Sequence, residues 1–295
     1  MKVHLVDGTY ELFRHFFGAP SHVNGRGVEV AALRGVLGSV LALLEGGATH
    51  VGVATDHVIE SFRNELWPGY KDGSGVDPVL WAQSGPLEDG LELLGVPVWA
   101  MVEVEADDAL ASLAAVAADD PAVEQVLICT PDKDLGQCVA GDRVVQLDRR
   151  RGVVLDEAAV VAKFGVAPGS IPDYLALVGD SADGFPGLRG WGARSASAVL
   201  ARWGSIDAIP PDPRDWEVDV RGAPTLAATL ERERDRARLF KLLATLRVDR
   251  ELLAGGVGEL RWRGPEAGFA DLAADLDAPG LAARAERLAA ARAGG

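Results

Sequence analysis

The chain has 295 residues, of which 48% are hydrophobic and 25% are charged, the balance expected of a globular protein with a substantial core. Its formal net charge of −15 argues against nucleic-acid binding through overall charge, because phosphate contacts need Lys and Arg. The acidity has two explanations at this point: a charged surface that keeps the protein soluble, or a site that holds cations.

Cysteine usage and hydropathy exclude several classes of protein. The two cysteines, Cys129 and Cys138, lack the spacing of a zinc site or a disulfide framework. No apolar run reaches the roughly 18 residues of a membrane span, and no charged-then-apolar leader begins the chain. We therefore predict a cytoplasmic protein that makes no membrane contact.

The first half of the chain alternates strand and helix patterns. Short apolar runs predict strands at residues 3–6, 50–55, 97–102, 125–130 and 143–147, and helical periodicity predicts helices at residues 31–44, 87–94 and 106–118. The dipeptide Asp7-Gly8 after the first run predicts a turn. Strands that alternate with helices predict an α/β fold with a mainly parallel central sheet flanked by helices.

The pattern becomes helical after about residue 155. Helices are predicted at residues 160–164, 174–178, 193–203, 226–246 and 281–291, with a Pro-rich loop at residues 210–213. We predict an α/β domain over residues 1–155 and a helical module over residues 156–295. A Gly- and Pro-rich segment at about residues 70–90 interrupts the first domain as a long insertion, which is either a functional loop or surface decoration.

Acidic residues recur where the predicted strands stop. Asp7 follows the first strand, Asp56 follows the second, and Asp132 and Asp134 follow the run at residues 125–130. Because the carboxyl ends of parallel strands converge on one edge of a sheet, these four carboxylates are predicted to meet there.

Two further acidic groups have an ordinary structural explanation as well as a functional one. Glu105, Asp107 and Asp108 fall at the start of a predicted helix, where carboxylates also complement the helix dipole. Asp180 and Asp183 lie in a Gly-rich segment, where Asp is a common turn residue. For each group alone, capping or turn formation remains open beside a catalytic role.

Considered together, the acids favour a metal site. Carboxylates gathered at one edge repel each other, and divalent cations relieve that repulsion. All-oxygen ligands suit Mg²⁺ or Mn²⁺ rather than zinc. Two such ions can activate a water and stabilise the leaving oxygen of a phosphodiester. A haloacid-dehalogenase phosphatase is excluded, because Leu5 occupies the position of its nucleophilic Asp.

In this order the motifs resemble those of the bacterial 5′ nuclease family of 5′-3′ exonucleases and flap endonucleases, which includes a domain of many DNA polymerases I. The matching segments are Asp7, Thr55-Asp56, Phe62-Arg63, Tyr70-Lys71, Glu105-Ala106-Asp107-Asp108 and residues 130–137, 179–187 and 190–196. The resemblance runs from Val3 to about Leu246. It implies a PIN-like nuclease core followed by a helix-hairpin-helix-like (H3TH) module.

The resemblance also implies roles for individual residues. The expected ligands of two or more Mg²⁺ or Mn²⁺ ions are Asp7, Asp56, Glu105, Asp107, Asp108, Asp132, Asp134, Asp180 and Asp183. Lys71 and Arg63 are the expected catalytic cations, with Lys71 at the base of a helical arch formed by the insertion. The residues expected to bind DNA in the hairpin, together with a K⁺ ion, are Gly187, Arg189, Gly190, Gly192, Arg194 and Ser195.

The basic half of the site departs from the family pattern. The family usually has an Arg shortly after the Tyr-Lys pair, whereas no Lys or Arg occurs from Asp72 to Glu88. In the hairpin, Trp191 replaces an Ile and Arg194 replaces a Lys. All the expected metal-binding acids are retained.

The resemblance implies an enzyme that hydrolyses DNA phosphodiesters at free 5′ ends, flaps or nicks in replication or repair. RNA of RNA–DNA hybrids is a further expected substrate. No polymerase segment follows the hairpin module, so a stand-alone nuclease is expected. Two alternatives stay open here: a catalytically weak, structure-specific DNA-binding protein and a PIN-like ribonuclease.

Overall fold

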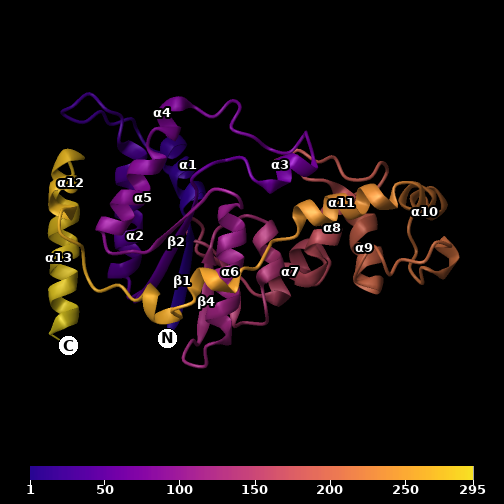
Figure 1. Cartoon of the computed structure of the whole chain (residues 1–295). Coiled ribbons are helices and arrows are strands. Elements are labelled where there is room, and N and C mark those ends of the chain that lie inside the picture. Colours follow the sequence, from indigo (N-terminus) through magenta and orange to yellow (C-terminus); the bar gives the residue numbers. More distant parts are fainter. Residues whose placement is uncertain (295) are drawn as a thin grey trace. The chain divides into compact units, whose positions relative to one another are not determined.

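The chain, in a computed structural model that describes residues 1–294, forms two compact units (Figure 1). Unit 1 consists of Met1–Ile59, Gly73–Thr130 and Val248–Gly295, and unit 2 consists of Glu60–Asp72 and Pro131–Arg247. Each unit therefore combines segments that are distant in sequence. The predicted division into residues 1–155 and 156–295 stays a prediction.

Unit 1 contains a parallel sheet with the strand order β3-β2-β1-β4. The strands are β1 (Lys2–Asp7), β2 (His50–Asp56), β3 (Val98–Met101) and β4 (Gln125–Cys129). β1 lies in the middle, where Val3 pairs with His50 on one side and with Val126 on the other. Leu5 and Val53 are fully buried, as expected for strands that are covered on both faces. These pairings confirm the predicted parallel sheet.

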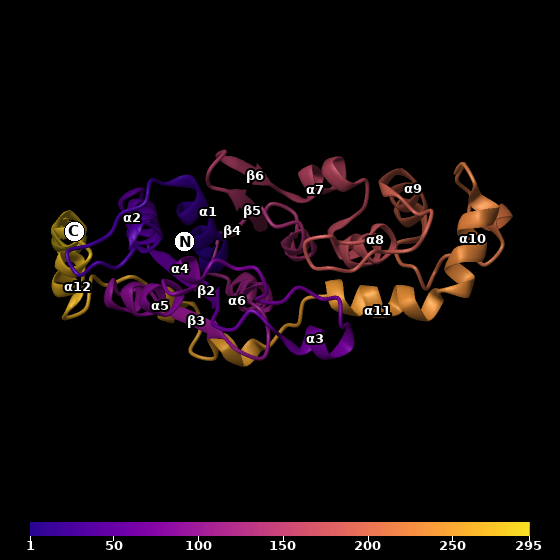
Figure 2. The ribbon, with the colours of Figure 1, turned by 90° about the horizontal axis from the view of Figure 1, so that it is seen from above.

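Helices cover both faces of this sheet. α2 (Ala31–Glu45) and α5 (Ser84–Leu93) lie on one side, and α6 (Ala106–Asp119) lies on the other side against β1, β2 and β4 (Figure 1, Figure 2). The other helical elements of unit 1 are α1 (Gly8–Gly18), α4 (Pro78–Trp81), η4 (Arg250–Leu253), η5 (Val257–Leu260), α12 (Phe269–Asp275) and α13 (Pro279–Ala293). The α/β architecture predicted from the sequence is therefore confirmed.

Strand β1 continues directly into helix α1, so the turn predicted at Asp7-Gly8 is wrong. Asp7 caps this helix, because its side chain accepts a hydrogen bond from the Tyr10 N–H at 2.8 Å. A Cβ on Gly8 would lie 2.6 Å from Cγ2 of Thr55 on β2. The glycine therefore serves close packing between helix and strand rather than a turn.

The segment predicted as an insertion at residues 70–90 is only partly irregular. Its second half contains α4 and the start of α5, and Leu80, Leu87 and Leu91 are fully buried. Leu87 and Leu91 lie in the helix predicted at residues 87–94, which begins earlier than predicted, at Ser84, and includes Gly85 and Pro86. Proline is tolerated there because it lies in the first turn of α5. The irregular part of this segment therefore lies mainly before Pro78.

Unit 2 is mainly helical and has its own hydrophobic core. Its elements are α3 (Phe62–Leu66), η1 (Asp134–Cys138), β5 (Val144–Asp148), β6 (Val153–Leu155), α7 (Glu157–Phe164), η2 (Pro168–Ser170), α8 (Ile171–Val178), α9 (Ala193–Trp203), η3 (Pro213–Asp215), α10 (Ala223–Arg232) and α11 (Arg234–Ala244). α8 packs against α9 and α11. Phe185 and Phe240 stack in the core with ring centroids 5.5 Å apart, and Trp216 is fully buried there.

The single helix predicted at residues 226–246 is two helices, α10 and α11, separated at Glu233. Glu233 has φ −116° and ψ 24°, outside the helical region. The break is hidden in the sequence because Leu230 and Ala237, buried on either side of it, are seven residues apart. That spacing is the one that a continuous amphipathic helix would have.

The chain from Val248 onward belongs to unit 1. The Asp249 N–H donates to Ser112 Oγ of α6 at 2.9 Å, and Trp99 Nε1 of β3 donates to the Leu252 carbonyl at 2.8 Å. α13 packs against α2. Across residues 1–294, none of the helices has the length and apolar character that a membrane crossing requires.

Candidate active site

Two predicted metal ligands end neighbouring strands of unit 1. Asp7 ends β1 and Asp56 ends β2, and these strands pair in parallel. Asp7 is only 6% exposed, and its Oδ2 accepts a hydrogen bond from Thr130 Oγ1 at 2.9 Å. Asp56 Oδ1 accepts from the Ala106 N–H at 2.8 Å, which joins this strand end to the start of α6. The fold thus fixes both carboxylates at the carboxyl edge of the sheet.

The acids at the start of α6 have a demonstrated structural role. Glu105 is the N-cap residue, and its N–H donates to Asp108 Oδ2 at 3.0 Å in a capping box. Glu105 and Asp108 are buried, whereas Asp107 is half-buried. A carboxylate has two oxygens with about four lone-pair sites, so capping and metal binding by the same residue are compatible. Their role as metal ligands stays a prediction.

Three acids of unit 2 form a compact cluster, the unit 2 carboxylate group. Asp134, Asp180 and Asp183 each offer one carboxylate oxygen, and these oxygens lie within 4.8 Å of one another. Asp134 begins η1, and the other two lie in the turn after α8. The Asp180 N–H donates to the Phe185 carbonyl at 2.8 Å across that turn. Asp132 is exposed and lies beside the group, where its Oδ1 accepts from the Asp134 N–H at 3.0 Å.

The electrostatics of this group favour a bound cation. All three side chains are buried, and Asp134 Oδ1 has no hydrogen-bond partner within residues 1–294. Burial raises the pKa of Asp134 well above its usual value, and the nearby charges of Asp132, Asp183 and Asp180 add to that effect. A buried, unpartnered oxygen among other carboxylates fits a hard divalent cation.

Two lysines offset part of this negative charge. Lys133 Nζ lies 2.5 Å from Asp180 Oδ2, and Lys71 Nζ lies 3.1 Å from Asp183 Oδ1. Partial burial opposes the charge on Lys133, but its contact with Asp180 and the charges of Asp134 and Asp132 raise its pKa above the usual value. Lys71, which the sequence predicts to be catalytic, therefore lies beside the carboxylate group.

Arg63, the second predicted catalytic cation, is buried with only 1% exposure. Its Nε donates to the Leu243 carbonyl at 2.8 Å, and its Nη2 donates to the Thr245 carbonyl at 3.2 Å. These contacts join α3 to the end of α11 and so stabilise unit 2. They give no support to a catalytic role, which stays a prediction.

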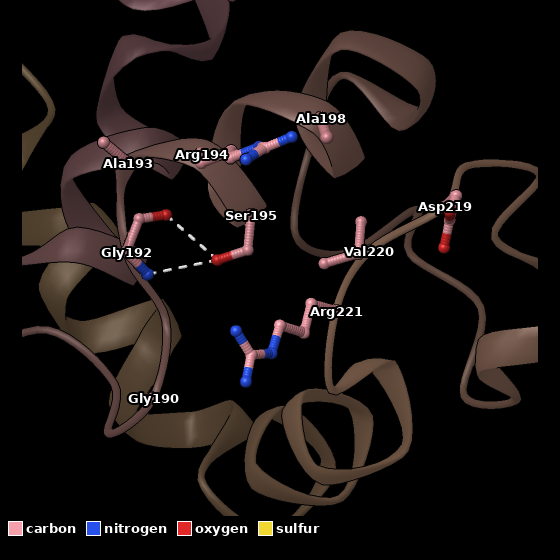
Figure 3. A pocket seen from close by; sticks show the side chains of 9 residues that line it. All are labelled: Gly190, Gly192, Ala193, Arg194, Ser195, Ala198, Asp219, Val220 and Arg221. Atoms are coloured by element: carbon pink, nitrogen blue, oxygen red, sulfur yellow. Dashed lines mark hydrogen bonds between the residues drawn. The ribbon is translucent and has the colours of Figure 1, made fainter.

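The glycine-rich loop before α9 borders a hollow of about 840 Å³ in unit 2 (Figure 3). Gly190 has φ +90°, and Gly192 is the N-cap residue of α9. Ser195 Oγ accepts from the Gly192 N–H at 3.1 Å and donates to the Gly192 carbonyl at 3.0 Å, so its hydroxyl stabilises the start of the helix. Arg194 also lines the hollow.

Not all the predicted hairpin residues border this hollow. Gly187 has φ +68°, and a Cβ there would lie 2.4 Å from the Gly179 nitrogen, so its observed role is tight backbone packing. The sequence did not identify Asp219, Val220 and Arg221, which lie before α10 and form part of the wall. They match no motif, and a basic residue in a loop is too common on protein surfaces to be a signal.

Unit 1 thus has a parallel sheet with acids at its strand ends, and unit 2 has a buried carboxylate group and a glycine-rich loop before a helix. The chain belongs to the 5′-3′ exonuclease family. Residues 2–165 match the family described as "5′-3′ exonuclease, N-terminal resolvase-like domain", and residues 166–267 match the one described as "5′-3′ exonuclease, C-terminal SAM fold". The resemblance inferred from the motifs is confirmed.

Individual relatives agree with this membership. DNA polymerase I of Pseudomonas aeruginosa is 36% identical over 260 residues, which cover 84% of this chain and 27% of the polymerase. The chain thus spans about a quarter of the length of that relative. The 5′-3′ exonuclease of Aquifex aeolicus is 32% identical over 225 residues, covering 75% of each protein. T5 5′-exonuclease, solved with divalent zinc ions, has the same fold, with a TM-score of 0.68, 15% identity and 98% coverage of both chains.

The raised pKa of Asp134 generates a prediction about stability and metal binding. A carboxyl whose pKa is raised by folding stabilises the protein below its unfolded pKa, and that contribution is lost as pH rises through the folded pKa. At neutral pH without divalent metal, Asp134→Asn should therefore raise the melting temperature by several degrees, because removing a buried charge that is only partly compensated is worth about 1–3 kcal/mol. Thermal unfolding in EDTA measures this change.

Adding Mg²⁺ or Mn²⁺ should reverse the order of stability. The melting temperature of the wild-type protein should rise with increasing metal concentration, and that of Asp134→Asn should rise much less. Asp235→Asn is the matched control, because Asp235 is a fully exposed acid of the same unit. Equal metal-induced stabilisation of the wild type and Asp134→Asn would contradict the metal assignment.

Proposed function

We propose that this chain is a divalent-metal-dependent 5′ nuclease that hydrolyses DNA phosphodiesters at free 5′ ends, flaps or nicks. The observation that carries the proposal is the unit 2 carboxylate group with its unpartnered Asp134 oxygen, in a chain of the 5′-3′ exonuclease family. The names of the relatives support a role in replication or repair. RNA of RNA–DNA hybrids is a further proposed substrate, and a cytoplasmic location stays a prediction.

We infer that two or more Mg²⁺ or Mn²⁺ ions are the cofactors. Asp134, Asp180 and Asp183 supply only oxygen donors, which suit these hard ions. The predicted ligands of unit 1 are also carboxylates, so the preference for hard ions is the same there. For a K⁺ ion near the glycine-rich loop the support is the family resemblance alone.

Divalent ions bound to these carboxylates would supply Lewis-acid activation of the attacking water and of the phosphodiester. The chain's own residues supply position and charge. Lys71 brings a positive charge to the edge of the carboxylate group, where it would stabilise the charge that develops on the phosphate in the transition state. Lys133 holds Asp180 in place through their ion pair. Arg194 and the backbone beside Gly192 would hold the duplex.

Product mapping tests the proposed function. A 5′-labelled flap duplex, a nicked duplex, a single strand and an RNA version of each are incubated with the protein in Mg²⁺ or Mn²⁺. We expect cleavage of DNA at or near the 5′ end or flap junction. Tight DNA binding without cleavage in either metal would instead identify a structure-specific binding protein. Cleavage of RNA alone would identify a ribonuclease.

Removing one carboxylate of the unit 2 group should abolish most of the activity. Asp134→Ala should lower kcat on a flap substrate about a hundredfold or more, because loss of an ion that contributes several kcal/mol to the transition state costs at least two factors of ten. Single-turnover cleavage measures the loss, and circular dichroism confirms the fold. Asp235→Ala, on the exposed face of α11, should cut like the wild type. Full activity in Asp134→Ala would refute the site.

Lys71→Ala should reduce kcat about 10²- to 10³-fold with little change in DNA affinity, since its charge acts on the transition state. Lys71→Arg should recover part of the rate because it restores a cation beside Asp183. Lys163, an exposed lysine over the Phe164 ring in the same unit, provides the control Lys163→Ala, which should keep its rate. If Lys71→Ala weakens binding but leaves kcat unchanged, Lys71 is a docking residue and not a catalytic one.

A further inference from the structure

Arg221 projects into the hollow from the wall that faces the glycine-rich loop. It lies just before α10, on a different segment from the loop residues Gly190 and Gly192. Figure 3 shows its guanidinium group directed across the hollow toward that loop. The side chain is exposed and makes neither an ion pair nor a hydrogen bond within the described part of the chain. Nothing in the packing of unit 2 therefore accounts for its position.

The lack of an ion partner distinguishes Arg221 from most basic residues around it. Between residues 166 and 246, all of which the structure describes, acids pair with Arg202, Arg214, Arg232, Arg234, Arg236, Arg238 and Lys241. The basic residues of this stretch with no acid partner are Arg189, Arg194 and Arg221. Two of these three, Arg194 and Arg221, line the same hollow. Most of the unpaired positive charge in residues 166–246 therefore lies around the hollow.

We propose that Arg221 binds a backbone phosphate of duplex DNA across the hollow from the glycine-rich loop and Arg194. The proposal rests on the proposed nuclease function and adds to it a positioning residue outside the hairpin motif. A hollow of about 840 Å³ is larger than one phosphate group, so it admits a stretch of sugar–phosphate backbone. A guanidinium remains charged at any working pH and can donate two hydrogen bonds to one phosphate.

Asp219 places a negative charge on the same wall of the hollow as Arg221. It also lines the hollow, and Figure 3 shows its carboxylate at the far end of the wall from the glycine-rich loop. A carboxylate there repels DNA, so Asp219 and Arg221 have opposite effects on affinity. Removing each charge in turn therefore gives changes of opposite sign, which a general loss of structure does not produce.

The test is DNA binding measured by fluorescence anisotropy on the full chain, with a labelled duplex in EDTA and a series of KCl concentrations. Arg221→Ala should raise Kd about tenfold at 0.1 M salt and should lower the slope of log K against log salt by about 0.9, the value for one phosphate contact. Arg221→Lys should stay within a few-fold of the wild type. Asp219→Asn should lower Kd about twofold.

Arg214→Ala is the matched control, because it removes the same charge from an exposed arginine that is paired with Asp212. It should keep the wild-type Kd and salt slope. Both arginine variants should melt within about 1–2 °C of the wild type, since exposed side chains contribute little to stability. In flap cleavage, Arg221→Ala should raise KM and leave kcat at saturating DNA unchanged.

The inference is overturned if Arg221→Ala binds with the wild-type Kd and salt slope, or if Arg214→Ala loses as much affinity. Inorganic phosphate at constant ionic strength should not displace the duplex. If millimolar phosphate does displace it in the wild type but not in Arg221→Ala, the hollow is a site for free phosphate. Because binding is measured without metal, failure of this inference is distinguishable from failure of the nuclease proposal, which product mapping reports.

Discussion

Asp134, Asp180 and Asp183 bring carboxylate oxygens within 4.8 Å of one another in a part of unit 2 that is largely shielded from water. Charges of the same sign at this separation oppose folding, and Lys133 and Lys71 offset only part of the repulsion. The turn after α8 and the start of η1 nevertheless hold the three side chains together. Two separate segments of the chain thus keep three carboxylates together against their mutual repulsion. A cation bound among their oxygens would remove that repulsion and so accounts for the arrangement.

The strands and their acids could be predicted because two independent physical signals coincide there. Apolar runs such as Val3–Val6 mark buried strands, and a carboxylate at the end of each run is outside the apolar pattern. What the pattern could not predict is how Asp7-Gly8 is used. Asp and Gly are common turn residues, yet here Asp7 caps α1 and Gly8 allows that helix to approach β2. The choice depends on tertiary packing, which local sequence does not encode.

For other residues the sequence left the role undecided, and it did not identify Arg221. Asp108 caps α6, so its motif position is compatible with a structural and a catalytic role at once. Arg63 matches a family position, but its guanidinium group donates hydrogen bonds to the carbonyls of Leu243 and Thr245. These residues are about 180 positions away in the sequence, so only the fold brings them to Arg63. Arg221 matches no motif at all. Its significance depends on its place opposite the glycine-rich loop and on the pairing of its neighbours.

The pairing of charges also reconciles the net charge of −15 with the proposed DNA binding. Exposed charges interact over about 8 Å at physiological ionic strength, so a phosphate responds to the side chains around it and not to the total charge of the chain. Between residues 166 and 246, which the structure describes in full, Arg194 and Arg221 on the wall of the hollow lack acid partners, whereas Arg202 and Arg214 are paired with acids. An acidic protein can therefore keep a small basic surface, provided that its other basic residues are paired. In the proposed complex, acidity elsewhere would repel DNA from the remaining surface and favour this one orientation.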